Sequence, residues 1–316
     1  MNGPVPVPYT SADKVKTCRG SRLKGRARVL DAVLRLLSHL SLRQLHVLAN
    51  LIAFLSRVIK TREANVAMTN VNLCFPGWSQ KDRHSLARQA MRENAKGIAE
   101  IAALWYWPRQ KVLKLVRSVD GEAVLEQALA EGKGLLVLAP HQGAWEILQM
   151  WLAQKVSLNA LYRPPRWPEL EALLNKGRSR SGAKFWPAKP SGVRALLKAL
   201  KAGETVGVLP DQSPPGEGVY APFFGQPAKT MTLFSKLAAR TGAPVIVGWA
   251  ERLPSAQGYK LHWYRATESL ADADSNIAAK ALNQEIESVV MQCPEQYQWT
   301  YRRFLKRPAG LSNPYE

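Results

Sequence analysis

The residues most able to do chemistry lie in one short stretch, Ala139-Pro-His-Gln-Gly-Ala-Trp-Glu146. It follows an apolar run and precedes a helical pattern, so we expect His141 in a turn and Glu146 at the start of a helix. A histidine beside a carboxylate is a general-base pair, because the carboxylate fixes the tautomer of the ring and stabilises the imidazolium. Five residues on a regular helix span about 500°, so the two side chains can meet only if His141 precedes the helix. The alternative is an ordinary loop histidine and a first-turn glutamate favoured by the helix dipole.

No covalent nucleophile is evident beside this pair. The sequence has no Gly-x-Ser-x-Gly elbow, no His-Glu-x-x-His zinc motif and no Walker loop. This favours direct attack by a bound hydroxyl on an activated acyl donor, with no cofactor. Cys18, Cys74 and Cys293 lie far apart and form no CxxC pair, so we expect reduced thiols and no structural zinc site.

Alternating strands and helices are expected to position the pair. Apolar runs predict strands at 134–139, 204–209, 244–251 and 259–265, and helical patterns predict helices at 120–131, 144–155, 191–201, 231–241 and 276–292. This alternation predicts an α/β fold with a mostly parallel central sheet flanked by helices. His141 and Asp211 each follow a predicted strand, at the carboxyl-end edge where such sheets bind ligands. Asp211 has a plainer interpretation, as a helix cap or turn residue.

The N-terminal part of the chain differs from this core. Residues 14–28 hold seven basic residues and no acid, and apolar residues then recur at helical spacing to position 55. The longest charge-free run, 44–56, is too short to cross a hydrocarbon core, which needs roughly 20 residues. We predict a helix lying at a membrane interface, the alternative being a core helix behind a solvated basic tail. Residues 61–118 are expected to be helical, with a break at 75–77.

These patterns divide the chain into four parts. We predict a basic, disordered tail at 1–28, an N-terminal helical region with a membrane-associating helix at 29–118, an α/β core at 119–308 and a C-terminal tail at 309–316.

The charge of the chain requires an anionic partner. Of 316 residues, 44 are Lys or Arg and 24 are Asp or Glu, which gives a formal net charge of +20. With 46% hydrophobic residues, the chain is neither a disordered protein nor a polytopic membrane protein. Nucleic acid, an anionic membrane, an acidic protein and a phosphorylated substrate all fit such a charge. No nucleic-acid-binding module is recognisable, so we do not expect nucleic acid as a partner.

Ordered sequence blocks around the histidine resemble a known family. His141 and Glu146 are similar to the His-x4-Asp/Glu motif of glycerolipid-type acyltransferases. Five blocks follow one another in order: Leu161-Tyr-Arg-Pro164, Gly177-Arg-Ser-Arg180, Leu209-Pro-Asp-Gln212, Val219-Tyr-Ala-Pro-Phe-Phe-Gly225, and Pro294-Glu-Gln-Tyr-Gln-Trp299 with Arg302-Arg-Phe304. Asn65, Asn72 and Phe75-Pro76 precede them. Together they resemble the late lipid A acyltransferases, the lauroyl and myristoyl transferases of Gram-negative inner membranes. The resemblance runs from about residue 30 to 308.

This resemblance implies a reaction and roles for six residues. An acyl chain would pass from acyl carrier protein to a hydroxyl group of a Kdo-bearing lipid A precursor, forming an acyloxyacyl ester. His141 would be the general base and Glu146 its orienting partner. Arg178 and Asp211 would be further functional residues, and Arg163 and Arg180 would bind phosphate or carboxylate groups, for which an arginine fork is suited. The enzyme would work at the cytoplasmic face of the inner membrane, as a peripheral or monotopic protein.

Two alternatives stay open from the sequence. Relatives with other lipid acceptors share much of this pattern, so a lysophospholipid or an aminolipid is the rival acceptor. A non-enzymatic basic protein that coats membrane or nucleic acid is the more distant alternative.

The N-terminal stretch departs from the family pattern. Arg35 and Arg43 interrupt its apolar residues, whereas some family members have a membrane-embedded N-terminus.

Overall fold

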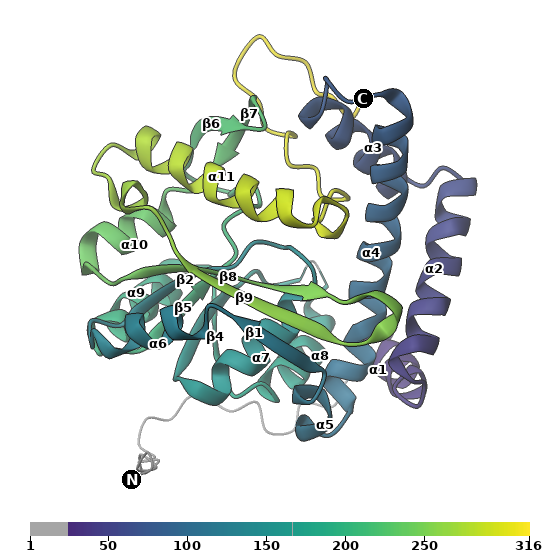
Figure 1. The fold of residues 1–316 in the computed structure, drawn as a ribbon, viewed down its shortest axis with the longest axis horizontal. Helices are drawn as coiled ribbons and strands as arrows, with labels where there is room; N and C mark the ends of the chain where they lie inside the picture. Colours follow the sequence, from purple (N-terminus) through teal and green to yellow (C-terminus); the bar gives the residue numbers. More distant parts are fainter. Residues whose placement is uncertain (1–24, 166) are drawn as a thin grey trace.

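One seven-stranded sheet organises the molecule in a computed structural model that describes residues 25–165 and 167–316 (Figure 1). Its strand order is β1-β9-β8-β2-β5-β3-β4. The strands are β1 (Val116–Asp120), β2 (Leu135–Leu138), β3 (Leu158–Tyr162), β4 (Lys184–Pro187), β5 (Thr205–Val208), β8 (Val245–Arg252) and β9 (Tyr259–Arg265). A separate antiparallel hairpin is formed by β6 (Val219–Phe223) and β7 (Gln226–Thr230).

The sheet is mostly parallel, as predicted. Strands β8, β2, β5, β3 and β4 all pair in parallel, whereas β9 runs antiparallel to β8 and carries β1 at the edge. All four residues of β2 are buried, which explains its continuous apolar sequence. Leu136 and Leu138 pack into one core, and Leu135 and Val137 pack into a second core on the opposite face.

Helices cover both faces of the sheet. The core that holds Leu138 includes residues of α9 (Pro190–Lys201), α10 (Leu233–Thr241) and α11 (Ser275–Gln292). The core that holds Val137 includes residues of α6 (Glu122–Ala130), α7 (Trp145–Lys155) and α8 (Pro168–Ser179). The α/β prediction is therefore confirmed by a three-layer arrangement of helices, sheet and helices.

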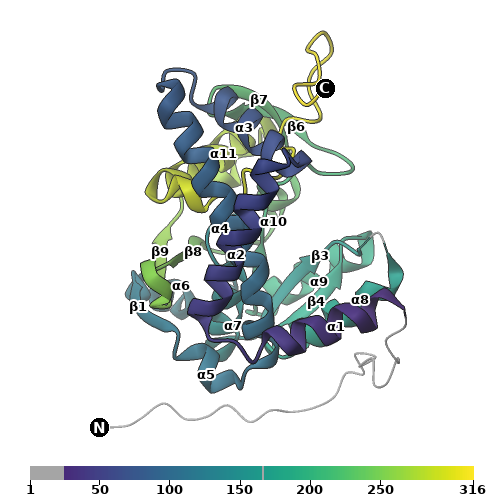
Figure 2. The same cartoon turned by 90° about the vertical axis from the view of Figure 1, so that its right-hand side faces the viewer.

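The N-terminal region is a set of helices packed beside the sheet (Figure 2). They are α1 (Arg26–Leu37), α2 (Leu42–Val58), α3 (Arg62–Cys74), α4 (Gln80–Tyr106) and α5 (Arg109–Leu113). Ser41 and Gln44 form a capping box that begins α2. Leu45, His46 and Ala49 on α2 are buried, and α2 packs along α4.

Several boundaries differ from the expectations. Helix α1 begins at Arg26, so the last residues of the predicted tail are helical; residues 1–24 of that tail, which include Cys18, lie outside the described part. The C-terminal residues pack back on the molecule, because the Tyr315 hydroxyl donates to Asn70 Oδ1 on α3 and accepts from the backbone N–H of Phe304.

Some elements escaped the sequence patterns. Strand β1 lies in a segment expected to be helical; it is a short edge strand with no buried residue, so it has no apolar signature. Strands β3 and β4, helix α8 and the β6–β7 hairpin were not predicted either. The hairpin turns at Phe224 and Gly225, both at positive φ, rather than at an Asn-Gly or Asp-Gly pair.

Within residues 25–165 and 167–316, no individual helix is long and apolar enough to cross a bilayer. Helices α2 and α3 meet that test only as a pair, and they are bent by 83° where they join.

Candidate active site

The site lies where two neighbouring parallel strands end. Leu138 on β2 pairs with Val208 on β5, and His141 and Asp211 each follow three residues beyond that pair. The shared register brings the two side chains together. His141 Nδ1 lies 2.7 Å from Asp211 Oδ1, and the backbone N–H of His141 donates to Asp211 Oδ2 at 3.0 Å. Two residues that are far apart in the sequence therefore form one unit.

The contacts of the ring define its tautomer. An ionised Asp211 can only accept, so Nδ1 of His141 carries the hydrogen and the lone pair of a neutral ring lies on Nε2. The amide Nε2 of Gln212 lies 3.4 Å from that nitrogen and also donates to Gln298 Oε1 at 3.0 Å. The Trp145 ring packs edge-on against His141, with 5.3 Å between the centroids. Nε2 is thus the atom of His141 that is available as a base.

Asp211 is held in its ionised form. Its side chain is 2% exposed, whereas that of His141 is 16% exposed. Burial by itself would raise the pKa of Asp211, but the attraction to His141 and the hydrogen bonds from its ring and backbone lower the pKa below the ordinary value. A buried, charged carboxylate facing an imidazole is suited to stabilise the imidazolium form.

The turn that carries His141 is fixed by backbone contacts on two sides. Gly143 N–H donates to Gln296 O and Ala144 N–H donates to Ala250 O, both at 2.9 Å. Gly143 has a φ of +59°, and a Cβ there would lie 1.9 Å from Ala250 O. The turn therefore has room only for glycine at this position.

Glu146 is not the partner of the His141 ring that the motif suggested. It lies in the first turn of α7 and accepts from Arg178 Nη2 at 3.2 Å and from Gln149 Nε2. The hydrogen bond at Nδ1 of His141 goes to Asp211 instead. The cause is the sheet register, which places Asp211 beside the ring, whereas Glu146 is directed toward α8. Glu146 and Arg178 thus form a second charged pair.

The other two arginines are placed differently. Arg163 follows β3 at the same edge of the sheet and is exposed. Arg180 lies at the end of α8 and donates from Nη2 to Trp107 O, so its guanidinium ties α8 to the end of α4. Of the six predicted site residues, the structure pairs His141 with Asp211 and Glu146 with Arg178. It shows no polar contact of Arg163 or Arg180 with any of those four residues, all six lying in the described part of the chain.

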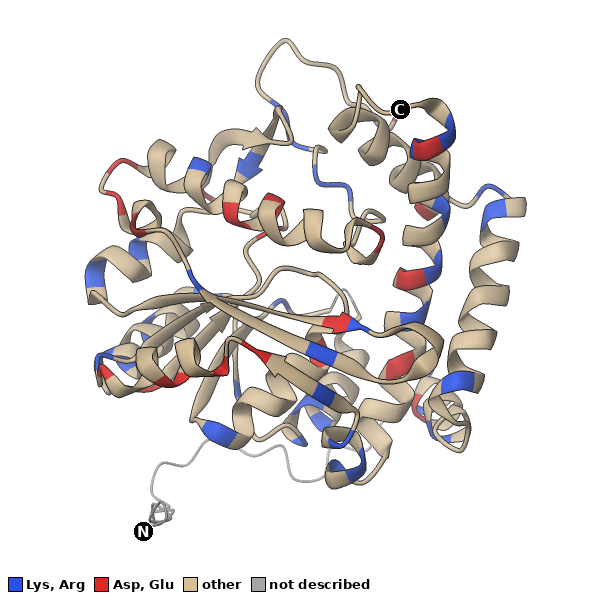
Figure 3. Ribbon diagram, viewed as in Figure 1, with Lys and Arg blue, Asp and Glu red and all other residues tan. Residues whose placement is uncertain are grey.

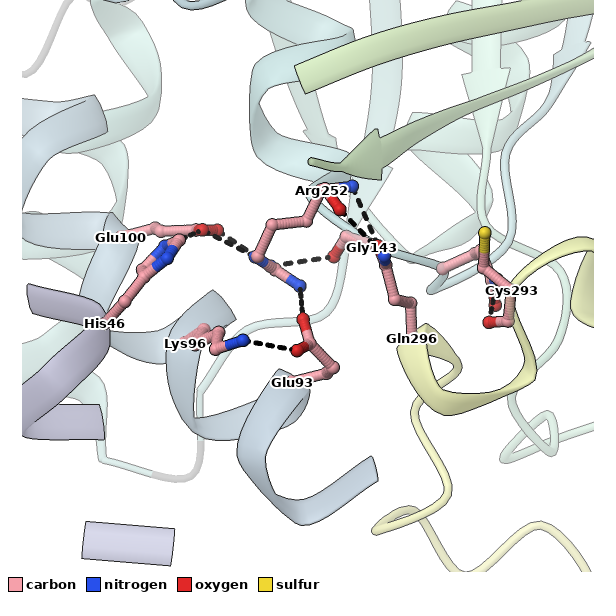
Figure 4. A network of polar contacts seen from close by, with 9 residues as sticks. His46, Glu93, Lys96, Glu100, Gly143, Arg252, Cys293 and Gln296 are labelled. Atoms are coloured by element: carbon pink, nitrogen blue, oxygen red, sulfur yellow. Dashed lines mark hydrogen bonds and ion pairs between the residues drawn. The ribbon is translucent and has the colours of Figure 1, made fainter. Parts of the chain in front are cut away.

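A buried charged network behind the turn was not anticipated (Figure 4). Arg252, at the end of β8, donates from Nε and Nη2 to the two carboxylate oxygens of Glu100 at 2.6 and 2.8 Å. Its Nη1 donates to Glu93 at 2.8 Å, and its Nη2 lies 3.5 Å from Gly143 O. His46 on α2 meets Glu100 at 2.7 Å. One signal was present in the sequence, because Glu100 is an acidic residue within the apolar stretch 98–104.

The cysteines in the described part are not poised to act as nucleophiles. Cys74 is buried and Cys293 is half-buried, and both are free thiols. Burial, with the nearby carboxylate of Glu251, raises the pKa of Cys293 to about 12, and burial raises that of Cys74 further. Among residues 25–165 and 167–316, no cluster of three or more His, Cys, Asp or Glu side chains could hold a metal ion.

Comparison with known proteins places this arrangement among lipid-modifying enzymes. Residues 29–306 match the family model described as bacterial lipid A biosynthesis acyltransferase. The chain is 30% identical over 266 residues to the lipid A biosynthesis palmitoleoyltransferase of Escherichia coli K12, covering 84% of this chain and 86% of the relative. A lipid A biosynthesis acyltransferase of Haemophilus influenzae is 31% identical over 77% of this chain and 76% of its own length. The lauroyltransferase of E. coli K12 is 28% identical over 80% of this chain and 83% of its own length.

Proposed function

Because this chain belongs to the bacterial lipid A biosynthesis acyltransferase family and is an acyltransferase, we propose that it transfers a fatty acyl chain from the thioester of acyl carrier protein to a hydroxyl group of a Kdo-bearing lipid A precursor. The product is an acyloxyacyl ester. The observation that carries this proposal is the His141–Asp211 contact at 2.7 Å, which leaves Nε2 of His141 as the base.

The reaction follows from that geometry. Nε2 of His141 takes the proton of the acceptor hydroxyl while the hydroxyl oxygen attacks the thioester carbonyl carbon. The resulting tetrahedral intermediate collapses, the C–S bond breaks, and the thiolate of the carrier takes the proton back from Nε2. Asp211 stabilises the imidazolium present between the two proton transfers. One ester and one thiol form from one hydroxyl and one thioester, so no oxidant, metal or cofactor is required.

The remaining polar residues have supporting roles in this proposal. Gln212, whose amide lies 3.4 Å from Nε2 of His141, is positioned to orient the acceptor hydroxyl. Glu146 acts through Arg178, which it holds at 3.2 Å, rather than through the His141 ring. Arg178 and the exposed Arg163 bind the phosphate or carboxylate groups of the acceptor, where an arginine fork matches the oxygen geometry.

The charge of the chain suits these substrates. A lipid A precursor carries phosphates and Kdo carboxylates, acyl carrier protein is acidic, and an inner membrane leaflet is anionic. A protein of net charge +20 attracts all three, so electrostatic steering favours each encounter.

Helix α2 provides the membrane contact in our proposal. Its inward face packs on α4, but its outward face leaves a row of large apolar side chains about half exposed or more, including Leu51 and Phe54. The full set on this apolar face of α2 is Val47, Leu51, Ile52, Phe54, Leu55, Val58 and Ile59. The only charged residues of α2 are Arg43 and Arg57, one near each end (Figure 3). An apolar face between basic residues fits the plane of an anionic interface, which favours peripheral or monotopic association on the cytoplasmic side.

Vesicle flotation tests this contact. We expect Leu51→Glu to lower the affinity for phosphatidylethanolamine–phosphatidylglycerol vesicles at least about tenfold, because a charge replaces an apolar side chain that enters the interface. Ile277→Glu on α11 is the matched control, since Ile277 is similarly exposed at 49% against 54% for Leu51. Equal loss of binding in both variants would mean that α2 is not the membrane contact.

A transfer assay tests the reaction and the acceptor together. Purified wild type and His141→Ala are incubated with acyl carrier protein thioesters of several chain lengths and with Kdo2-lipid IV or lysophospholipid as acceptor. We expect transfer to the lipid A precursor by the wild type alone. Transfer only to lysophospholipid, or to an aminolipid, would keep the chemistry and replace the acceptor, and full activity of His141→Ala would remove His141 as the base.

A further inference from the structure

The buried network around Arg252 links the His141 turn to the N-terminal helices. Arg252 is 4% exposed and Glu100 is 1% exposed, so their two-point contact lies wholly inside the protein. Glu93, which accepts from Arg252 Nη1, also accepts from Lys96, and Glu100 accepts a contact from His46 on α2 (Figure 4). Two carboxylates, Glu93 and Glu100, thus face two cations, Arg252 and Lys96.

Gln296 connects this network to the catalytic turn. Its side chain binds both backbone groups of Arg252: Oε1 accepts from the N–H at 2.8 Å, and Nε2 donates to the carbonyl at 2.9 Å. Its own backbone carbonyl accepts from Gly143 N–H at 2.9 Å. A Cβ on Gly143 would overlap Ala250 O, so the turn lies directly against β8 at this residue. Gln296 thus clamps the end of β8 to the residue two positions after His141.

The same segment holds the rest of the turn. Gln298 N–H donates to His141 O at 3.1 Å, and the fully buried Gln142 donates from Nε2 to Cys293 O at 2.7 Å. Three consecutive residues from His141 to Gly143 are therefore each bonded to residues 293–298. That segment is held against β8 by Gln296, and β8 is held against α4 by Arg252.

We propose that Arg252 and Gln296 are positioning residues, which fix the His141 ring against Asp211 by clamping the turn between β8 and residues 293–298. This inference rests on the proposed role of His141 as the base. A buried ion pair is poor support for stability, because desolvation offsets most of the attraction. Geometric precision is what such a pair can supply, and a misplacement of about 1 Å in a catalytic group costs about 10²-fold in rate.

The decisive comparison is between variants that loosen the turn and one that only destabilises the core. Gln296→Ala removes the clamp without burying a charge, and Arg252→Met removes the buried cation. Leu125→Ala on α6 truncates a fully buried side chain away from the turn and is the control for lost stability. All are assayed well below their melting temperatures, and rates are divided by the folded fraction measured by circular dichroism.

We expect Gln296→Ala and Arg252→Met to lose about 10- to 100-fold in kcat/KM, and Leu125→Ala to lose at most about twofold. In the two clamp variants the loss should fall on kcat, with KM nearly unchanged, because the turn holds the base and not the acceptor. Leu125→Ala should keep both kcat and KM near the wild-type values.

Two outcomes separate this inference from the function it rests on. If the clamp variants match Leu125→Ala in corrected kcat and in KM while His141→Ala is inactive, the clamp is only structural and the proposed base stands. If His141→Ala keeps its activity, the proposed role of His141 as the base is wrong, and the inference that rests on it is wrong as well. Should Arg252→Met not fold, Gln296→Ala alone decides, and Arg252→Lys, which keeps the charge but loses the fork, should fall between wild type and Gln296→Ala.

Discussion

Two histidines of this protein each meet a carboxylate at 2.7 Å, yet their surroundings are opposite. His141 contacts Asp211 through Nδ1, which leaves Nε2 facing the Gln212 amide at the edge of the sheet. His46 contacts Glu100 through Nε2, and that carboxylate is already held at two points by Arg252. The side chain of His141 is 16% exposed and that of His46 is 8% exposed.

The difference shows what makes a histidine–carboxylate pair catalytic. The distance between ring and carboxylate is the same in both, so it does not distinguish them. One difference is the ring nitrogen that does not contact the carboxylate, which in His141 lies beside the Gln212 amide. The other is the cation Arg252, which also contacts the carboxylate of Glu100. Asp211 contacts the His141 ring, whereas Glu100 contacts both Arg252 and His46. We therefore propose that His141 acts in catalysis and that His46 supports the fold.

Replacing each histidine gives the largest expected contrast. We expect His141→Ala to lower kcat/KM by about 10²–10⁴-fold, the usual worth of a general base. His46→Gln keeps a donor for Glu100, so its loss in kcat/KM should be at least tenfold smaller and accompany a lower melting temperature. Steady-state assays and thermal unfolding of both variants measure this. Comparable losses of activity at equal folded fraction would show that the two pairs are not functionally distinct.

Replacing Asp211 sharpens the assignment of the reactive nitrogen. In Asp211→Asn the amide oxygen can still accept from the backbone N–H of His141. The amide nitrogen then donates to Nδ1 of the ring, which forces the ring hydrogen onto Nε2. The base is blocked, so kcat/KM should fall about 10²-fold or more, without exceeding the loss in His141→Ala. Nitrogen chemical shifts of the labelled ring report the tautomer. An unchanged tautomer with unchanged activity would assign the Asp211 contact to structure alone.

The carboxylate of the His46–Glu100 pair predicts a smaller, pH-dependent effect on the free energy of unfolding. Burial by itself would raise the pKa of Glu100, but Arg252 and His46 lower it from 4.5 to about 2. Its contribution is therefore complete above pH 4.5 and is lost as the pH falls toward 2. Glu100→Gln should be less stable than wild type at pH 7, and this gap should narrow by about 2 kcal/mol by pH 3. Urea unfolding at both pH values measures it, and a constant gap would mean that Glu100 does not carry the charge.

Much of the fold followed from local patterns. The apolar run before Pro140 and the run before Pro210 indicated strands, and both became neighbours in the sheet with His141 and Asp211 at their ends. Amphipathic spacing likewise predicted α7, α9, α10 and α11. These signals are local because burial of one or both faces of an element sets the spacing of apolar residues along its own sequence.

The pairing inside the site did not follow from local patterns. A motif of six residues suggested Glu146 as the partner of His141, whereas the contact goes to Asp211, 70 residues away. Strand order decides this contact, and the residues of β2 carry no signal that β5 is its neighbour in the sheet. Arg252 was missed for a related reason, since its partners Glu93 and Glu100 lie on α4 and only the packed structure brings them to the end of β8.

The same separation in sequence has a consequence during synthesis. His141 is synthesised long before Asp211, and residues 293–298, which hold the turn, are synthesised later still. Contacts this distant form late, because closing long loops costs entropy before it gains contacts. A nascent or truncated chain that lacks residues 293–298 can therefore build much of its sheet without an ordered catalytic turn. Activity should therefore appear only after residues 293–298 have joined the fold.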